Sequence, residues 1–139
     1  MEADITRVLG LDIGDSRIGV ALSDPQGILA SPLTIINRTE ERADIEAVVA
    51  LVRQNQVGRV IIGLPISMDG SQGRQAEKVK AFVTELCRHT DVPVEFRDER
   101  LSTVSAKRMV QGVRKTGKRT RYDAMAAALI LQSYLDEAL

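Results

Sequence analysis

Three carboxylates, Asp12, Glu99 and Asp123, combine a chemically useful side chain with a position where they could share one site. Asp12 interrupts an apolar run, residues 8–13, that has the pattern of a buried strand. A carboxylate inside such a run is costly unless a cation compensates its charge. Gly14 and Gly19 leave space for a phosphate or another backbone to approach it. We therefore take Asp12 as the centre of the chemistry; an Asp that only starts the following turn is the alternative.

Glu99 follows the last predicted strand, and Asp123 lies near the start of the last predicted helix. Functional groups of open α/β sheets collect beyond the carboxyl ends of parallel strands, where Asp12 and Glu99 both fall. Asp123 precedes Ala127 by four residues, which puts it on the helix stripe expected to face the sheet. A favourable charge at a helix start is the alternative for Asp123. Strand alternation sends Asp98 to the side opposite Glu99, so we expect one of these two to face the site.

This donor set predicts a magnesium or manganese site. The chain has one His and one Cys, which argues against zinc, whereas converging carboxylates suit hard cations. In two-metal hydrolysis of phosphodiesters, ions about 4 Å apart activate water and stabilise the leaving oxygen. Asp12, Glu99 and Asp123 are therefore candidate ligands of Mg²⁺ or Mn²⁺ and candidate catalytic residues.

A basic segment without any acidic residue separates Glu99 from Asp123. Such a run is usually a solvated surface, but between two candidate metal ligands it is better interpreted as a guide for a phosphate backbone. Because aromatic residues are scarce, recognition should depend on backbone and shape rather than base stacking. The predicted nucleic-acid contacts are Arg17, Lys107, Arg108, Arg114, Lys115, Lys118, Arg119 and Arg121.

Length and composition predict one soluble domain over residues 1–139. The chain is 44% hydrophobic and 27% charged, which is ordinary for a globular protein. Its net charge is zero, so any nucleic-acid binding must come from local clusters. A single cysteine suits a reducing cytoplasm, and no apolar run has the length of a membrane span. Cys87 continues the spacing of Val83, which predicts a small core or boundary residue.

Hydrophobic periodicity predicts the order strand–strand–strand–helix–strand–helix–strand–helix–helix. Pro32 restricts the third strand to an edge or entry position, Thr39 is the expected N-cap of the first helix, and Gly58 its expected end. The order satisfies a mixed five-stranded sheet with helices on both faces, an RNase H-like α/β fold. The predicted strands span residues 8–13, 18–22, 30–36, 59–65 and 92–97; helices follow near 40–56, 76–86, 103–113 and from 121.

Four motifs follow one another along the chain: residues 9–14 with 17–24, residues 63–65 with 69–70, residues 98–103 and residues 123–131. In this order they resemble the YqgF (RuvX) family, whose RNase H-like members are described as Holliday-junction-resolvase-like and as nucleases for the 5′ end of pre-16S rRNA. The resemblance covers nearly the whole chain and implies a cytoplasmic, metal-dependent nuclease of ribosome biogenesis. The family's acidic positions fall on Asp12, Glu99 and Asp123. Ser16 stands where the family often has lysine, which puts one phosphate contact in doubt.

The first functional hypothesis is an RNA hydrolase acting near the 5′ end of pre-16S rRNA, with the assembling small ribosomal subunit as its setting. Asp12 and Asp123 would bind the metal, and Glu99 would bind it or orient water. Gly63 and Pro65 would shape the site, and residues 98 and 100 (Asp98 and Arg100) would support it.

Two alternatives remain open. A Holliday junction resolvase would use the same metal chemistry on branched DNA and would need a two-fold dimer, so a monomer or weak homodimer has to be considered. A non-catalytic nucleic-acid-binding factor in transcription or ribosome assembly would need the basic run and none of the carboxylates. The first turn also resembles a phosphate loop of actin-like ATPases, but those enclose nucleotide between two such domains and this chain has room for one.

Overall fold

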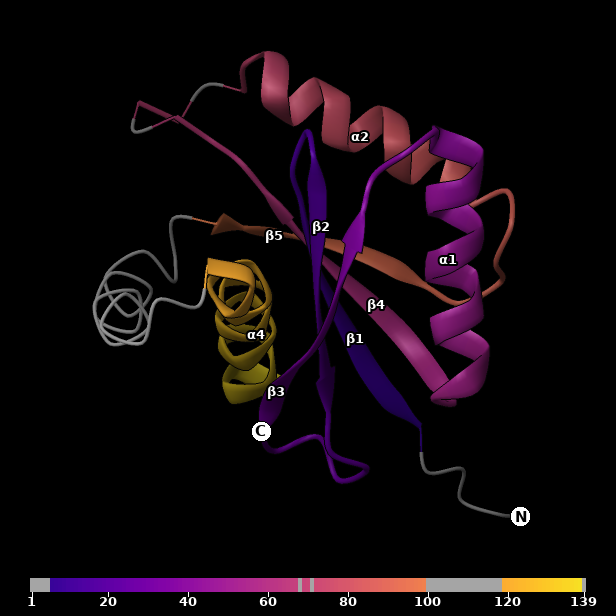
Figure 1. Cartoon of the computed structure of the whole chain (residues 1–139). Helices are drawn as coiled ribbons and strands as arrows, with labels where there is room; N and C mark the ends of the chain where they lie inside the picture. Colours follow the sequence, from indigo (N-terminus) through magenta and orange to yellow (C-terminus); the bar gives the residue numbers. More distant parts are fainter. Residues whose placement is uncertain (1–5, 68, 71, 100–118, 139) are drawn as a thin grey trace.

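Five strands form one mixed sheet in the order β3-β2-β1-β4-β5 (Figure 1). The computed structural model describes residues 6–67, 69–70, 72–99 and 119–138, with side chains described from 124 onward in the last of these ranges. The strands are β1 Arg7–Ile13, β2 Arg17–Ser23, β3 Ala30–Asn37, β4 Val57–Leu64 and β5 Val94–Asp98. The helices are α1 Glu41–Gln54, α2 Arg74–Leu86 and α4 Arg119–Ala138.

The connectivity confirms the predicted fold class. β1, β2 and β3 pair antiparallel, and β4 and β5 extend the sheet parallel to β1. Pro32 lies in β3, opposite Ala21, at an edge of the sheet where its missing N–H costs little. The five predicted strands are all present, with ends shifted by one or two residues. The predicted helix over residues 103–113 lies outside the described residues.

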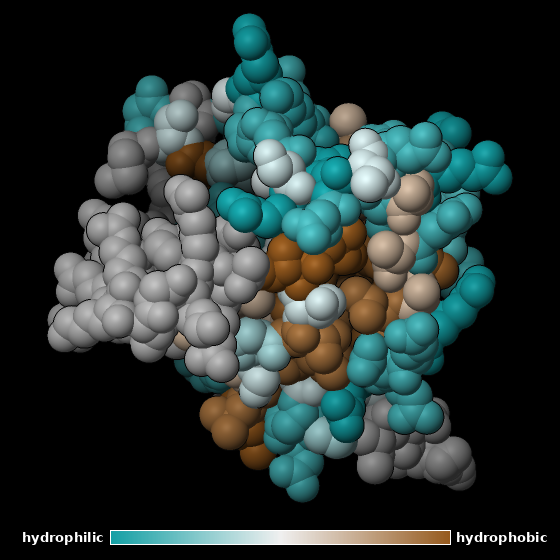
Figure 2. All heavy atoms as spheres, in the orientation of Figure 1, coloured by the Kyte–Doolittle hydropathy of each residue, from teal (hydrophilic) through white to brown (hydrophobic). Residues whose placement is uncertain are grey.

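Helices cover both faces of the sheet (Figure 1). On one face, α1 and α2 pack on the large core, to which they contribute Ile45, Val48, Val79 and Phe82. On the other face, α4 packs on a smaller core built with residues of β2 and β4. Figure 2 shows apolar side chains in the middle of the visible face between α4 and α1, surrounded by hydrophilic ones.

A close contact between β1 and α4 fixes the helix over the strand that carries Asp12. A Cβ on Gly10 would lie 2.8 Å from Leu131 Cβ and 3.1 Å from the Ala127 carbonyl oxygen. The absence of a side chain at Gly10 therefore lets α4 approach the sheet closely. The helix begins at Arg119, two residues before the predicted start at residue 121.

The ends of α1 differ from the prediction at both boundaries. The N-cap is Glu40, with no side-chain capping bond, rather than Thr39. Instead, the Thr39 N–H donates to Asp44 Oδ1 at 3.1 Å, so a side chain within the helix binds the backbone just before it. Gly58 does not end the helix. The reversal occurs at Gln56, which has a φ of 55°, and Gly58 lies within β4.

The surroundings of Gly58 and Cys87 differ from those that the sequence predicted. A Cβ on Gly58 would stand 2.7 Å from the Thr6 Cβ, so this glycine admits a neighbouring chain segment. Cys87 is exposed rather than a core or boundary residue, because α2 ends at Leu86 and Cys87 is its C-cap. Within the described ranges, no helix is both long and apolar enough to cross a bilayer.

Candidate functional site

Asp12 lies on the sheet face that α4 covers, between two glycines. Gly10, two residues earlier on β1, faces α4, and alternate residues of a strand share a face. On one side, Asp12 pairs with Gly19 of β2. On the other, Asp12 and Gly63 each follow the last registered pair of β1 and β4, Leu11–Ile62. Neither neighbour has a side chain, so a partly exposed carboxylate can sit on this otherwise apolar sheet.

Glu99 reaches the same place from β5. A Cβ on Gly63 would lie 3.0 Å from the Glu99 Cγ, so Glu99 packs over the backbone of that glycine. Arg97, two residues earlier, donates to Ser133 Oγ of α4 at 2.5 Å, which identifies its face as the one under α4. Asp98 alternates to the other face, as predicted from the strand period. Asp12 and Glu99 thus both adjoin Gly63 on the face that α4 covers.

Asp123 lies in α4 four residues before Ala127, and the Ala127 carbonyl approaches Gly10 of β1. The side chain of Asp123 lies outside the described part of the chain. Among the residues that the structure describes, no three His, Cys, Asp or Glu side chains form a metal-binding group. Two of the three predicted ligands therefore share a location, and the participation of Asp123 stays a prediction.

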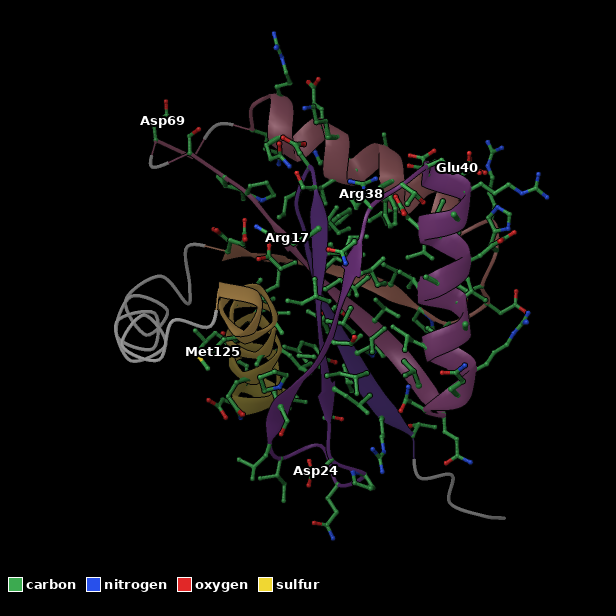
Figure 3. The ribbon with its side chains drawn as sticks, viewed as in Figure 1. Arg17, Asp24, Arg38, Glu40, Asp69 and Met125 are labelled. Carbon is green, nitrogen blue, oxygen red and sulfur yellow. The ribbon has the colours of Figure 1, made fainter. Side chains whose placement is uncertain are left out.

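The turn between β1 and β2 forms a polar pocket of about 240 Å³ beside Asp12. Its lining also includes Arg17, which places one predicted phosphate contact at the same opening as the central carboxylate. Figure 3 shows Arg17 near the upper end of α4 in this view. The turn closes through the Gly14 N–H, which donates to the Arg17 carbonyl at 2.9 Å. The other lining residues are Gly14, Asp15 and Ser16.

Lys78 of α2 lies at the rim of this pocket. Its Nζ is 3.4 Å from Asp15 Oδ1, and the two side chains are 54% and 67% exposed. An ion pair this exposed contributes little to stability, and it leaves a cation beside the opening. The sequence analysis did not single out Lys78, because nothing in its helix pattern distinguishes it from other surface lysines.

The sequence analysis also missed the pair Arg38–Asp44. Arg38 Nε lies 3.0 Å from Asp44 Oδ2, and the side chains are 21% and 3% exposed. Arg38 Nη1 donates to the Gly14 carbonyl, at the wall of the pocket, at 2.9 Å. A signal was available: Asp44 directly precedes Ile45 on the face of α1 that is buried, and a buried acid requires a partner.

The other predicted residues divide by whether the structure describes them. Pro65 follows β4 directly, in the loop that leaves the sheet beside Gly63. Arg119 and Arg121 begin α4, but their side chains lie outside the description. Arg100, Lys107, Arg108, Arg114, Lys115 and Lys118 lie outside the described residues, so their contacts with nucleic acid stay predictions.

Two carboxylates away from Asp12 have lowered pKa values. The side-chain hydrogen bond and charge of Arg97 lower the pKa of Glu137 at the end of α4. Hydrogen bonds from the backbone N–H groups of Leu29 and Ile28 lower the pKa of Asp24. Both anions stabilise local structure: one ties β5 to α4, and the other orders the β2–β3 turn.

The donor chemistry at Gly63 fits a hard divalent cation. Asp12 and Glu99 supply oxygen ligands, and the missing side chain of Gly63 lets Glu99 approach the strand next to Asp12. A pair of carboxylates on one sheet face also gains from a cation that offsets their mutual repulsion.

Solved structures with the same architecture include two resolvases. One is T. thermophilus RuvC in complex with a Holliday junction substrate, with a TM-score of 0.63 and 17% identity, covering 96% of each chain. The other is the Fowlpox virus resolvase in complex with Holliday junction DNA, with a TM-score of 0.56 and 13% identity, covering 96% of this chain and 99% of that one. With the strand order, these likenesses define an RNase H-like α/β fold.

Sequence comparison identifies the family within that class. A sequence model of RuvX, described as Holliday junction resolvase, matches residues 6–137. A protein of Dehalococcoides mccartyi is 50% identical over 90% of this chain and 94% of its own length. A protein of Roseiflexus sp. is 44% identical over 98% of both chains. Both carry the name "Putative pre-16S rRNA nuclease". The chain belongs to the RuvX family.

Proposed function

We propose that this protein is a metal-dependent nuclease that matures the 5′ end of pre-16S rRNA. The observation that carries the proposal is the meeting of Asp12 and Glu99 at Gly63, on the sheet face under α4. Relatives at 50% and 44% identity bear the name of such a nuclease. The two acids would supply the chemistry that such a nuclease requires, and the polar pocket that Asp12 lines would give access to them.

Asp12, Glu99 and Asp123 would hold Mg²⁺ or Mn²⁺. When bound, the metal supplies a polarised water and stabilises charge on the phosphate. Asp12 is the best-supported ligand, because β1 is the middle strand of the sheet and the backbone of Asp12 pairs with Gly19 of β2. Glu99 would bind the metal or accept a proton from water, and Gly63 would keep the two carboxylates close.

Positive side chains would hold the phosphate backbone. Arg17 opens into the pocket that Asp12 lines, and Lys78 lies at its rim. The basic segment between residues 102 and 122 would extend this surface toward α4. The proposed setting is the cytoplasm, with pre-16S rRNA in the assembling small ribosomal subunit as substrate, a single domain over residues 1–139, and a monomer or weak homodimer as the acting species.

A Holliday junction resolvase is the second candidate, favoured by the description of the matching family. The same carboxylates would cut branched DNA. Because symmetric cutting of two strands requires two active sites, this candidate requires a two-fold dimer. Light scattering on the purified protein, alone and with a four-way junction, measures that requirement; a monomer under both conditions contradicts it.

The test is cleavage of two labelled substrates, pre-16S 5′-leader RNA and a four-way DNA junction, with Mg²⁺ and then Mn²⁺. The compared proteins are the wild type and the variants Asp12→Asn, Glu99→Gln and Asp123→Asn. Asp91→Asn is the matched control, since Asp91 is an exposed acid before the amino end of β5, away from the Gly63 edge.

We expect wild type and Asp91→Asn to cut the RNA with either metal, and the three site variants to lose at least about a hundredfold in rate. Cleavage of the junction alone would support the second candidate instead. RNA binding without cleavage, unchanged in the three site variants, would contradict both nucleases and support a binding factor acting in transcription or ribosome assembly.

A further inference from the structure

The Arg38 guanidinium connects the turn beside Asp12 to the opposite core of the protein. Arg38 follows β3, which ends at Asn37, and lies in the short connection to α1 (Figure 3). Its Nη1 donates to the Gly14 carbonyl at 2.9 Å, and its backbone N–H donates to the Ser16 carbonyl at 2.9 Å. One residue thus binds two carbonyls of the three-residue turn, residues 14–16, that lines the pocket.

The guanidinium is itself held from two sides. Its Nε lies 3.0 Å from Asp44 Oδ2, and the side chain of Asp44 is only 3% exposed. Its Cζ lies 5.1 Å from the ring centroid of Phe82, a core residue of α2 that is 1% exposed. Removal of either partner of this buried ion pair would destabilise the fold, because the other charge would be left uncompensated. Asp44 is fixed in turn, because its Oδ1 accepts the Thr39 N–H at 3.1 Å.

The turn needs this support because its tip lies outside the core. Asp15 and Ser16 are exposed, whereas Ile13 and Ile18, which flank the turn, are buried. Strand pairing fixes the turn at Ile13 and Ile18, and the Gly14–Arg17 hydrogen bond closes it, but no core side chain holds its exposed tip. Arg38 binds the carbonyls on both sides of Asp15 and so constrains the wall of the pocket that Asp12 lines.

We propose that Arg38 and Asp44 are positioning residues of the nuclease: they hold the β1–β2 turn so that Asp12 and Arg17 keep their places at the pocket. This inference rests on the proposed function for its catalytic consequence, while its structural consequence can be measured without any substrate. The Arg38 side chain acts through the Gly14 carbonyl, whereas the bond to the Ser16 carbonyl comes from the backbone N–H and is kept when the side chain is changed. Lysine cannot replace it, because a single ammonium lacks the planar fork that serves Asp44 and Gly14 together and stacks on Phe82.

The experiment compares Arg38→Met, Arg38→Lys and Asp44→Asn with the wild type. Arg42→Met is the matched control: Arg42 lies four residues along the chain, its side chain is 82% exposed, and it pairs with Glu46 at 3.6 Å, away from the turn. Three quantities are measured: hydrogen exchange of the Gly14 amide, the kcat and KM for RNA cleavage, and the urea midpoint of unfolding. Exchange of the Ile62 amide in the interior strand β4 serves as the internal reference.

In Arg38→Met we expect the Gly14 amide to exchange about tenfold faster relative to Ile62, and kcat to fall about tenfold, while KM changes less than about twofold. The kcat of Arg38→Lys should fall by a similar factor and that of Asp44→Asn by less. The kcat of Arg42→Met should not change. If Arg38→Met does not fold, Arg38→Lys and Asp44→Asn decide the question. A lower urea midpoint with unchanged relative exchange and unchanged kcat would show a merely structural pair and overturn the proposal.

The two proposals fail in different ways. If the wild type cuts no RNA but exchange of the Gly14 amide responds as expected, Arg38 and Asp44 do hold the β1–β2 turn and the proposed nuclease function is wrong. If RNA is cut and neither exchange nor kcat responds to Arg38→Lys and Asp44→Asn, the nuclease stands and the positioning role is wrong.

Discussion

The side chain of Glu99 lies directly over the backbone of Gly63, where a Cβ would stand 3.0 Å from the Glu99 Cγ. The same Cβ would stand 2.6 Å from the Ile130 Cδ1 of α4. Gly63 therefore makes room for a carboxylate from β5 and for the helix above it. Because Asp12 occupies the neighbouring position on β1, this glycine determines how close the two acids can be.

We expect Gly63→Ala to reduce RNA cleavage much more than it reduces stability. The atoms that its methyl group meets are side-chain atoms of Glu99 and Ile130, which can rotate away at a cost of about 1 kcal/mol. A displaced Glu99 carboxylate is no longer aligned with Asp12, and kcat should fall about a hundredfold. Cleavage rates and urea midpoints are the measurements. Wild-type cleavage by a stably folded Gly63→Ala would contradict the role given to Glu99.

A second prediction concerns the link between β5 and α4. Arg97 Nη1 donates to Glu137 Oε1 at 3.2 Å, and Arg97, whose side chain is 12% exposed, lowers the pKa of Glu137. Since the pKa is lower in the folded state, the link stabilises the fold above the ordinary glutamate pKa and loses this effect as the pH falls through the lowered value.

The wild type should therefore have a higher urea midpoint than Glu137→Gln at neutral pH, and the difference should vanish as the pH falls through the lowered pKa of Glu137. Glu46→Gln is the control, because Glu46 belongs to an exposed pair with Arg42 and should show a smaller difference at neutral pH. A difference between wild type and Glu137→Gln that persists or grows at acidic pH would contradict the assignment.

The sequence was sufficient to predict the fold, because hydrophobic runs and helical stripes report directly on burial. It also predicted that Asp12 and Glu99 share one end of the sheet, since an acid within or just after an apolar strand is a visible exception to the pattern; their role as ligands stays a prediction. The burial of Asp44 could have indicated a cationic partner, but the link from Arg38 to the β1–β2 turn was not predictable, because it joins residues 22 to 24 positions apart in the chain. Local spacing does not encode such contacts.

The wrong predictions have a related origin. Thr39 and Gly58 were assigned by the usual preferences of helix caps, but Asp44 supplies the capping contact and Gln56 takes the left-handed conformation. At Gly58 a glycine needed for close approach to Thr6 was interpreted as a helix stop. Residue type alone does not distinguish a glycine chosen for conformation from one chosen for space.

A third prediction concerns the β2–β3 turn, where Asp24 Oδ1 accepts the N–H groups of Ile28 at 2.7 Å and Leu29 at 3.0 Å. Asp24→Ala should speed exchange of these two amides, while the Ile62 amide in β4 stays unchanged. These hydrogen bonds lower the pKa of Asp24, so in the wild type the same local protection should be lost as the pH falls through that lowered value. Exchange measured by NMR tests both effects.

Gln26→Ala is the control for this turn, since Gln26 is exposed in the same loop. Unchanged exchange of Ile28 and Leu29 in Asp24→Ala would show that the carboxylate does not order the turn. Both variants are expected to cleave RNA at the wild-type rate. The β2–β3 turn and the turn that lines the Asp12 pocket lie at opposite ends of β2 (Figure 3).

The last prediction sets Gly10 against Gly63. A methyl group on Gly10 would meet the Leu131 Cβ at 2.8 Å and the Ala127 carbonyl oxygen at 3.1 Å, atoms that move only with the α4 backbone. Gly10→Ala should therefore lower stability by about 1–3 kcal/mol, more than Gly63→Ala, whose neighbours are rotatable side-chain atoms. Gly73→Ser is the control, because a Cβ on Gly73 has nothing within 4 Å and a serine at this N-cap of α2 should be neutral or slightly stabilising. Urea unfolding of the three variants gives the order. If Gly10→Ala proves as stable as Gly73→Ser, then α4 is not held against β1 by this contact, and the placement of Asp123 near Asp12 loses its support.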